Sequence, residues 1–325
     1  MRPPMQSASV GTTGSSATIG RCLLDLDHTS AEVIRAILQR SQQHLLSGPD
    51  ARHDTLDGVT VANLFFEDST RTRVSFSIAA RRLGADVVDL TGKGSSVSKG
   101  ESVADTARTV EAMGVKSIVV RHHASGAAQQ VADAVKCAVL NAGDGRHAHP
   151  TQGLLDALTV ANALDRAESF DFSGLRIAIV GDIAHSRVAR SDIGAFVKLG
   201  ASVVCVGPPQ LAPRSLAAMG CDVSHSLDDV IESCDAIQML RVQFERGASI
   251  GSSRSYVDAF QLNEQRASRM KRHSIVMHPG PMNRGVEITS RVADGDQNKI
   301  FAQVTAGVAV RMAALEMTVS WRGAE

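Results

Sequence analysis

Residues 59–73 read VTVANLFFEDSTRTR, and this stretch decides the fold. Its first eight residues are almost wholly apolar, as expected of a parallel strand that is buried on both faces of a sheet. Apolar side chains then recur at helical spacing up to Gly84, a plausible end of the helix: Val74, Phe76, Ile78, Ala80 and Leu83. The stretch therefore predicts a buried strand, a short turn and a helix that begins at Ser69 and Thr70.

The turn between this strand and this helix has the composition of an anion site. Ser69 is the expected N-cap, so the amides of the first helical turn point beyond the end of the strand. A phosphate there would gain those hydrogen bonds, the helix dipole and the fork of Arg71. The alternative is a capped amphipathic helix whose arginines are solvated.

The same order of strand, polar loop and helix recurs along the first half of the chain. Further strands are expected at 87–90, 117–120 and 138–141, and they run into polar loops at 91–100, 121–123 and 143–152. This alternation makes a parallel sheet, in which ligands bind outside the carboxyl ends of the strands. Four loops rich in Ser, Thr, Arg, Lys, His and Gln at one edge indicate a binding site.

A second parallel sheet is expected after the polar stretch 165–174. Its strands are predicted at 175–180, 202–206, 235–240 and 274–277. The loop 181–187 offers one glycine where the dinucleotide fingerprint needs three, which argues against a nucleotide cofactor. The last helix, at about 299–321, needs a partner surface for an apolar stripe: Phe301, Val304, Val308, Met312, Leu315 and Val319.

Length and composition favour an α/β protein of two doubly wound parallel-sheet domains. The 325 residues are many for one core, and 34 basic and 34 acidic side chains cancel, so no global field attracts nucleic acid or a membrane. No apolar run is expected to span a bilayer. Five scattered cysteines indicate reduced thiols in a cytoplasmic protein, and residues 1–20, rich in Ser, Thr and Gly, are expected to form a disordered tail.

Six motifs give the chain a family resemblance: FFEDSTRTR (65–73), SSVSKGE (95–101), VVRHH (119–123), HPTQ (149–152), LRVQFER (240–246) and HPGPMNRGVEI (278–288). In this order they resemble the catalytic chains of aspartate carbamoyltransferases, within the aspartate/ornithine carbamoyltransferase superfamily, over about residues 21–322. Asp68 departs from the family, which more often has a small residue or proline there. An acid so close to a phosphate site would weaken binding unless it points away or is paired.

The resemblance implies a carbamoyl-phosphate-binding domain at 21–164, completed by the C-terminal helix 299–322, and an aspartate-binding domain at 165–298. The active site would lie between them and transfer the carbamoyl group of carbamoyl phosphate to L-aspartate, in de novo pyrimidine biosynthesis. It further implies a homotrimer or higher assembly with shared active sites, and it leaves room for a regulatory chain or a dihydroorotase partner. No metal or cofactor is implied.

The same resemblance assigns the site residues. Those for carbamoyl phosphate are Ser69, Thr70, Arg71, Thr72, Arg121, His149 and Gln152, and those for aspartate are Lys99, Arg187, Arg241, Gln243, Pro279 and Gly280. The catalytic residues would be Arg71, Thr72, Lys99, Arg121 and His149, with Glu245 and Arg246 as helpers. His149 would act as a neutral donor, so activity should fall on the acid side.

Three other functions compete with this one. A carbamoyltransferase could act on another amino acid such as ornithine, although LRVQFER and HPGP resemble the aspartate branch. A metal-dependent hydrolase could use His122, His123, His147 and His149, but these histidines lack a carboxylate at helical spacing, as in HExxH. A non-catalytic scaffolding homologue would be expected to have lost its charged site residues, which this chain keeps.

Overall fold

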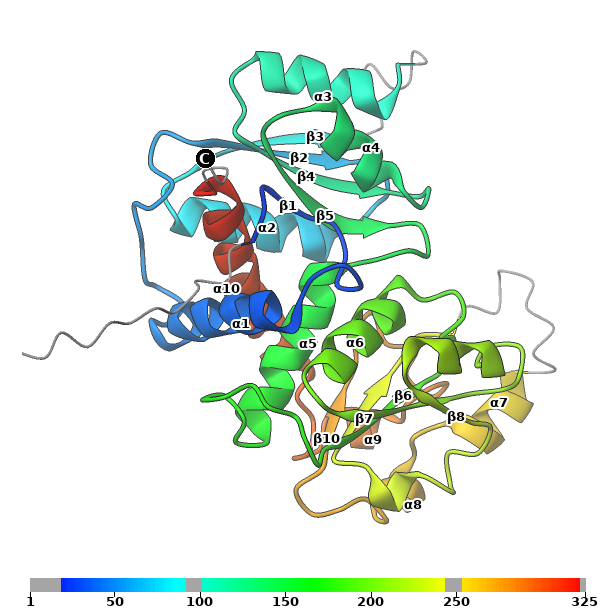
Figure 1. Cartoon of the computed structure of the whole chain (residues 1–325). Helices are drawn as coiled ribbons and strands as arrows, with labels where there is room; N and C mark the ends of the chain where they lie inside the picture. Colours follow the sequence, from blue (N-terminus) through cyan, green and yellow to red (C-terminus); the bar gives the residue numbers. More distant parts are fainter. Residues whose placement is uncertain (1–18, 92–100, 243–252, 322–325) are drawn as a thin grey trace, which may run out of the picture.

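The computed structural model describes residues 19–91, 101–242 and 253–321. They form two five-stranded parallel sheets in separate lobes, with strand orders β1-β5-β4-β2-β3 and β10-β9-β6-β7-β8 (Figure 1). The strands of the first sheet are β1 (Cys22–Leu23), β2 (Thr60–Phe65), β3 (Asp86–Thr91), β4 (Ser117–His122) and β5 (Ala138–Asp144). Those of the second are β6 (Arg176–Val180), β7 (Ser202–Val206), β8 (Asp222–Ser224), β9 (Ala236–Met239) and β10 (Ile275–Met277). The predicted fold class is confirmed.

Helices cover both faces of the first sheet and join the two lobes (Figure 1). Those of the first half are α1 (Ala31–Leu46), α2 (Thr70–Arg82), α3 (Val103–Ala112), α4 (Ala127–Ala134) and α5 (Pro150–Ala163). Those of the second half are α6 (Arg187–Lys198), α7 (Ser253–Phe260), α8 (Glu264–Ala267), α9 (Ser290–Ala293) and α10 (Ile300–Val319). The short strands β1 and β8 were not predicted, because two or three residues are too few to show a periodic pattern.

The strand register aligns the ends of the first sheet. Phe65 of β2 pairs with Thr91 of β3 on one side and with Arg121 of β4 on the other. The strands are parallel, so the residues that follow each strand emerge at the same edge. This register brings the end of β4 beside the turn that leads into α2.

The predicted inner face of α2 is wrong in part. Phe76 and Ala80 are fully buried, as expected, but Val74 and Ile78 are 46% and 38% exposed. Both pairs have helical spacing, so the pattern did not tell which pair faces the sheet. The observed inner face combines Phe76 and Ala80 with Ala79, whose small side chain permits close packing.

The predicted stripe of α10 is also wrong at its start. Phe301 and Val304 are 71% and 55% exposed, whereas Met312 and Leu315 are buried. The second half of the helix is buried almost all round, because it packs against α1, α2 and α5. A helix buried on every side shows no single apolar stripe.

By length and composition α10 could cross a membrane, contrary to the expectation that no apolar run is long enough. In the structure 61% of this segment is buried inside the molecule, between helices of the first lobe. Its apolar composition is therefore explained by its place in the core. The residue limits of the two domains stay a prediction, since one core cluster runs from Val61 in β2 to Ile177 in β6.

Candidate active site

The first turn of α2 carries four of the predicted phosphate ligands. Ser69 occupies the N-cap position, as predicted, but its side chain does not cap the helix. Its hydroxyl donates instead to Thr72 Oγ1 at 2.9 Å. Thr72 is buried, whereas Thr70 and Arg71 are exposed beyond the end of β2. The amides of this turn are thus not taken by the Ser69 hydroxyl, as an anion site at a helix start requires.

Arg121 is the penultimate residue of β4, lies beside this turn and is 9% exposed. Its Nη1 donates to the Ala142 carbonyl at 3.0 Å, and its Nη2 donates to Glu67 Oε1 at 3.4 Å. Burial and the neighbouring cations Arg187 and Arg71 lower the pKa of Arg121, Glu67 opposes them, and the net pKa is about 10. The guanidinium therefore remains charged at neutral pH and lies among other cations.

A glycine lets two of these guanidiniums approach each other. Gly143, the penultimate residue of β5, has a φ of +114°, and a Cβ built there would lie 2.9 Å from Arg121 Nη1 and 3.1 Å from Arg187 Nε. Any larger residue would displace both side chains and strain the backbone. The position therefore requires glycine for close packing of Arg121 and Arg187.

Glu67 joins the two lobes through Arg187. Arg187 begins α6 in the second half, and its Nη1 and Nη2 donate to Glu67 Oε2 and Oε1 at 2.9 and 2.7 Å. The fork of Arg187 is thus shaped and placed to hold a carboxylate. Sequence reasoning missed Glu67, although it lies inside the FFEDSTRTR motif, because no spacing rule relates it to a residue 120 positions away.

His149 occupies the N-cap position of α5 and is 4% exposed. Its backbone N–H donates to Ser191 Oγ at 2.9 Å, and its Nδ1 has no hydrogen-bond partner among the residues that the structure describes. Burial, together with the charges of Arg121, Arg311 and Arg187, holds the pKa of His149 well below its usual value. The imidazole is therefore neutral at physiological pH, and the one ring nitrogen that carries a proton can donate to a substrate carbonyl.

Gln152, one turn further along α5, is 8% exposed. Its Nε2 donates to both carboxylate oxygens of Asp156, at 3.1 and 3.2 Å. Gln152 therefore does not face water but is held inside the molecule at the start of α5. Sequence reasoning did not identify Asp156.

The HPGP segment after β10 reaches the first lobe. A Cβ built at Gly280 would lie 3.6 Å from Arg71 Cζ, so this loop of the second half adjoins the turn before α2. The loop is fixed from behind, because His278 accepts the Gly280 N–H at Nδ1 (2.8 Å) and contacts Glu287 through Nε2 (3.1 Å). Gly280 thereby lies beside Arg71, and the assignment of Pro279 and Gly280 to the aspartate site stays a prediction.

Of the remaining predicted residues, the structure describes Arg241 but not the four others. Arg241 follows β9 and is half-buried, and its Nε is buried without a hydrogen-bond partner in the described part of the chain. Lys99, Gln243, Glu245 and Arg246 lie outside the described residues. The side chain of Asp68 is exposed to solvent.

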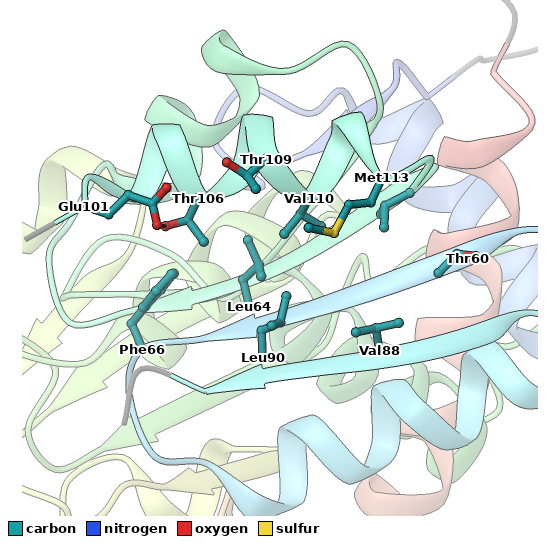
Figure 2. Close-up of a pocket in the computed structure, with 11 residues that line it drawn as sticks. Thr60, Leu64, Phe66, Val88, Leu90, Glu101, Thr106, Thr109, Val110 and Met113 are labelled. Atoms are coloured by element: carbon teal, nitrogen blue, oxygen red, sulfur yellow. Dashed lines mark hydrogen bonds between the residues drawn. The ribbon is translucent and has the colours of Figure 1, made fainter. Parts of the chain in front are cut away.

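Other features were tested as alternative sites. Across residues 19–91, 101–242 and 253–321, no group of three His, Cys, Asp or Glu side chains is arranged to hold a metal ion. An apolar cavity of about 250 Å³ lies between α3 and strands β2 and β3 (Figure 2). Its lining includes Leu64, Leu90 and Val110 but none of the predicted site residues.

Comparison with known proteins agrees with this geometry. Residues 21–162 match the family model described as aspartate/ornithine carbamoyltransferase, carbamoyl-P binding domain, and residues 173–318 match the corresponding Asp/Orn binding domain. The chain is 52% identical to the aspartate carbamoyltransferase catalytic subunit of Myxococcus xanthus over 299 residues, which cover 91% of this chain and 99% of the relative. It is 54% identical to the same subunit of Thermobifida fusca over 263 residues, or 80% and 82% of the two chains.

Solved structures of carbamoyltransferases have the same fold as this chain. The aspartate transcarbamoylase of Trypanosoma cruzi, in complex with carbamoyl phosphate and aspartate, is 30% identical with a TM-score of 0.82, covering 93% of this chain and 96% of the other. The ornithine carbamoyltransferase of Thermus thermophilus also has a TM-score of 0.82, covering 93% and 100% of the chains. At 24% identity, the second similarity concerns the fold alone.

Proposed function

The chain belongs to the aspartate/ornithine carbamoyltransferase family, and we propose that it transfers the carbamoyl group of carbamoyl phosphate to the amine of L-aspartate. The products are N-carbamoyl-L-aspartate and phosphate, in de novo pyrimidine biosynthesis. The observation that carries the proposal is the meeting of Arg71, Arg121, His149 and Arg187 at one junction, where loops of both lobes converge.

Carbamoyl phosphate is bound in the first lobe. Ser69, Thr70, Arg71 and Thr72 hold the phosphate at the start of α2, and Arg71 offsets the charge of the leaving oxygen. Thr72, Arg121 and His149 donate to the carbamoyl oxygen, where negative charge grows during attack; such donors contribute on the order of 3 kcal/mol each. Two observations support this role: the imidazole of His149 is neutral, and its Nδ1 has no hydrogen-bond partner in the described part of the chain.

Aspartate is bound between the lobes. Arg187 takes the α-carboxylate, and its bidentate contact with Glu67 supports this assignment because it shows that a carboxylate fits the fork. Arg241 and Gln243 take the β-carboxylate. The carbonyls near Pro279 and Gly280 orient the attacking amine, and Lys99 contributes a further positive charge.

The reaction needs no covalent enzyme intermediate. The aspartate nitrogen attacks the carbamoyl carbon, the bond from that carbon to the bridging oxygen breaks, and the departing phosphate accepts the proton of the amine. Acceleration comes from orientation of the two substrates and from charge arranged in advance.

The assignment of aspartate is tested by the choice of acceptor. Turnover of L-aspartate should exceed that of L-ornithine by several orders of magnitude, because Arg241 repels the ornithine ammonium and a buried unpaired charge is heavily penalised. Arg241→Ala should raise the aspartate KM and leave carbamoyl phosphate affinity nearly intact. Comparable turnover of both amino acids would overturn the assignment, and absence of turnover with either would favour the scaffolding alternative.

We further propose that the enzyme is a cytoplasmic homotrimer, or a higher assembly of trimers, with active sites shared between subunits. The support is the family membership, together with the assignment of Lys99, in the motif SSVSKGE, to the aspartate site by resemblance. A regulatory chain or a dihydroorotase could bind such an assembly. Light scattering coupled to size exclusion would measure its mass.

A further inference from the structure

A buried polar cluster lies behind the candidate site, where four elements of both lobes meet. It contains Asp156 of α5, Asp192 of α6, Gln238 of β9 and Gln303 of α10, all at most 2% exposed. None of these residues belongs to the substrate contacts proposed above. The cluster reaches the site through Gln152, whose amide binds Asp156, and through Gln303, which accepts the backbone N–H of His278 beside the HPGP loop.

Three glutamine amides donate to the same carboxylate. Gln303 Nε2 lies 2.6 Å from Asp156 Oδ1, and Gln238 Nε2 lies 3.0 Å from Asp156 Oδ2. The orientation of the Gln303 amide is fixed independently, because its Oε1 accepts the backbone N–H of His278 at 2.9 Å. With Gln152 as the third donor, Asp156 acts as an acceptor toward every amide of the cluster.

The second carboxyl group keeps Asp156 ionised. Two buried carboxylates in contact cannot both be charged, so the pair shares a proton. Burial, and then the charge of Asp156, raise the pKa of Asp192 well above its usual value. Burial also raises the pKa of Asp156, but only to about 6, because hydrogen bonds from Gln303, Asp192 and Gln152 favour its charged form. Asp192 is therefore the protonated partner at neutral pH.

We propose that Asp156 is a positioning residue that fixes the amide of Gln152 with its NH₂ group toward Asp156 and its Oε1 toward the ligand. This inference rests on the proposed function, in which Gln152 binds the carbamoyl nitrogen. An ionised carboxylate has no proton to donate, so it accepts only the NH₂ end of the amide. Gln152 is thus held as an acceptor and selects acyl phosphates that carry an NH₂ group.

Two stable ligands isolate this selection. Phosphonoacetamide and 2-oxopropylphosphonate share the phosphonate and the carbonyl, and they differ only in an NH₂ group against a methyl group. By titration calorimetry at pH 7.5, the wild-type protein should bind the amide about tenfold more tightly, a difference of about 1.4 kcal/mol. Gln152→Ala should reduce this preference to within about twofold.

The matched variants are Asp156→Asn and Asp192→Asn. An amide at 156 can accept or donate, so the side-chain amide of Gln152 can flip and exchange its NH₂ group with its Oε1. The preference for phosphonoacetamide should then again fall to within about twofold. An amide at 192 still donates to Asp156, so this variant should keep the preference. The double variant Asp156→Asn/Gln152→Ala should lose no more preference than Gln152→Ala alone.

A purely structural role for Asp156 makes a different forecast. Asp156→Asn would then weaken both ligands equally and keep their ratio, which would overturn the inference. The inference would also be overturned if Asp156→Asn lowered the ligand preference as much in a protein that already carries Gln152→Ala as it does in the wild type. A wild-type protein that binds both ligands equally would overturn the inference alone, whereas one that binds neither would overturn the proposed function as well.

The wild-type protein provides a test that needs no variant to fold. As the pH falls from 7.5 to 5, Asp156 takes up a proton, can donate to Gln152, and the preference should decline. The neighbouring groups keep their charge over this range. Arg311 of α10 stays charged with a pKa of about 10, and His149 of α5 stays neutral over most of the range. Asp192 of α6 is already protonated at pH 7.5. Because the two phosphonates titrate alike, a constant ratio over this range would contradict the inference.

Discussion

At the scale of single residues, three guanidiniums of the site region, those of Arg121, Arg187 and Arg311, lie beside carboxylates from other parts of the chain. Arg187 binds Glu67 across the two lobes. Arg311 is buried over the ring of Phe76, 5.2 Å from its centroid, and the negative charge of Asp156 supports its protonated form. Pairing of this kind is needed because an unmatched buried charge costs several kcal/mol. The site can therefore gather cations for anionic substrates and still be stable without them.

A prediction at this scale concerns the charge of His149. Its imidazole should not titrate between pH 6 and 8, because burial and three nearby arginines hold its pKa well below the usual value. NMR of the histidine ring signals, assigned with His149→Gln, would measure this. Any loss of activity caused by protonation of His149 should accordingly lie below pH 6.

His28 is the internal control for this measurement. It is exposed, and a hydrogen bond and the charge of Asp25 raise its pKa above the usual value. Its signals should therefore shift within the same pH range. A midpoint for His149 above pH 6 would show that its environment is more polar than the structure indicates.

The sequence was sufficient to predict the residues at strand ends but not their partners. Arg71 begins a predicted helix, Arg121 directly follows a predicted strand, and His149 lies in a predicted loop at the same sheet edge, so the rule for parallel sheets locates them. Glu67 faces Arg187, and Asp156 faces Gln303, 147 positions away, only because of how the lobes pack. Local sequence patterns carry no information on contacts between residues so far apart in the chain.

At the scale of elements, helix faces proved harder to predict than helix positions. The limits of α2 and α10 agree with the sequence to within a few residues, but Val74 and Phe301 are exposed although they were assigned to inner faces. The choice of face depends on which neighbour each helix meets. For α10 the neighbours are α1, α2 and α5, and the sequence does not tell which of them packs against which face of α10.

A prediction at this scale concerns the clamp between α1 and α10. Glu316 accepts from Arg40 Nε and Nη2, both at 2.6 Å, and contacts His44 Nε2 at 3.0 Å. Burial alone would raise the pKa of Glu316, but the hydrogen bonds from His44 and Arg40 outweigh it and hold the pKa at about 2. Glu316→Gln should therefore lower the free energy of unfolding at pH 7 by about 2 kcal/mol.

The sign of the pH dependence follows from the lowered pKa. The carboxylate stabilises the folded protein above its unfolded pKa, near 4.5, and this stabilisation is lost as the pH falls from about 4.5 toward 2. Urea unfolding at pH 7 and pH 3 should thus show a smaller difference between variant and wild type at pH 3. Asp294→Asn, which removes the exposed ion pair with Arg284, is the control and should have a smaller effect at pH 7. An equal effect of Glu316→Gln at both values would exclude an ionic clamp.

At the scale of the whole molecule, the proposed chemistry depends on surfaces that lie far apart in the chain. The turn before α2 belongs to one lobe, and Arg187, Arg241 and Gly280 belong to the other (Figure 1). Lys99 lies outside the described residues, and the proposed sharing of sites would supply it from a neighbouring subunit.

The prediction at this scale tests that sharing. Lys99→Gln and Arg121→Ala should each be nearly inactive, because each removes one charge from every site. Mixed and reassembled, the two variants should regain part of the wild-type activity, since some sites then combine an intact Lys99 with an intact Arg121. Native mass spectrometry would verify that mixed trimers form. If they form and remain inactive, Lys99 acts within its own chain or has no catalytic role.

The return of α10 to the first lobe has a consequence for synthesis on the ribosome. The inner face of α2 and the buried side of α5 are covered by a helix that ends at Val319, although α5 itself ends at Ala163. At 5 to 20 residues per second, roughly 10 to 30 s pass between translation of these two points. For that time the nascent chain lacks the helix that packs on α2 and α5, whose Phe76 and Leu158 the finished protein buries completely. The amino-terminal lobe is thus made first and completed last, so a chaperone that shields apolar surface during translation would raise the yield of folded protein.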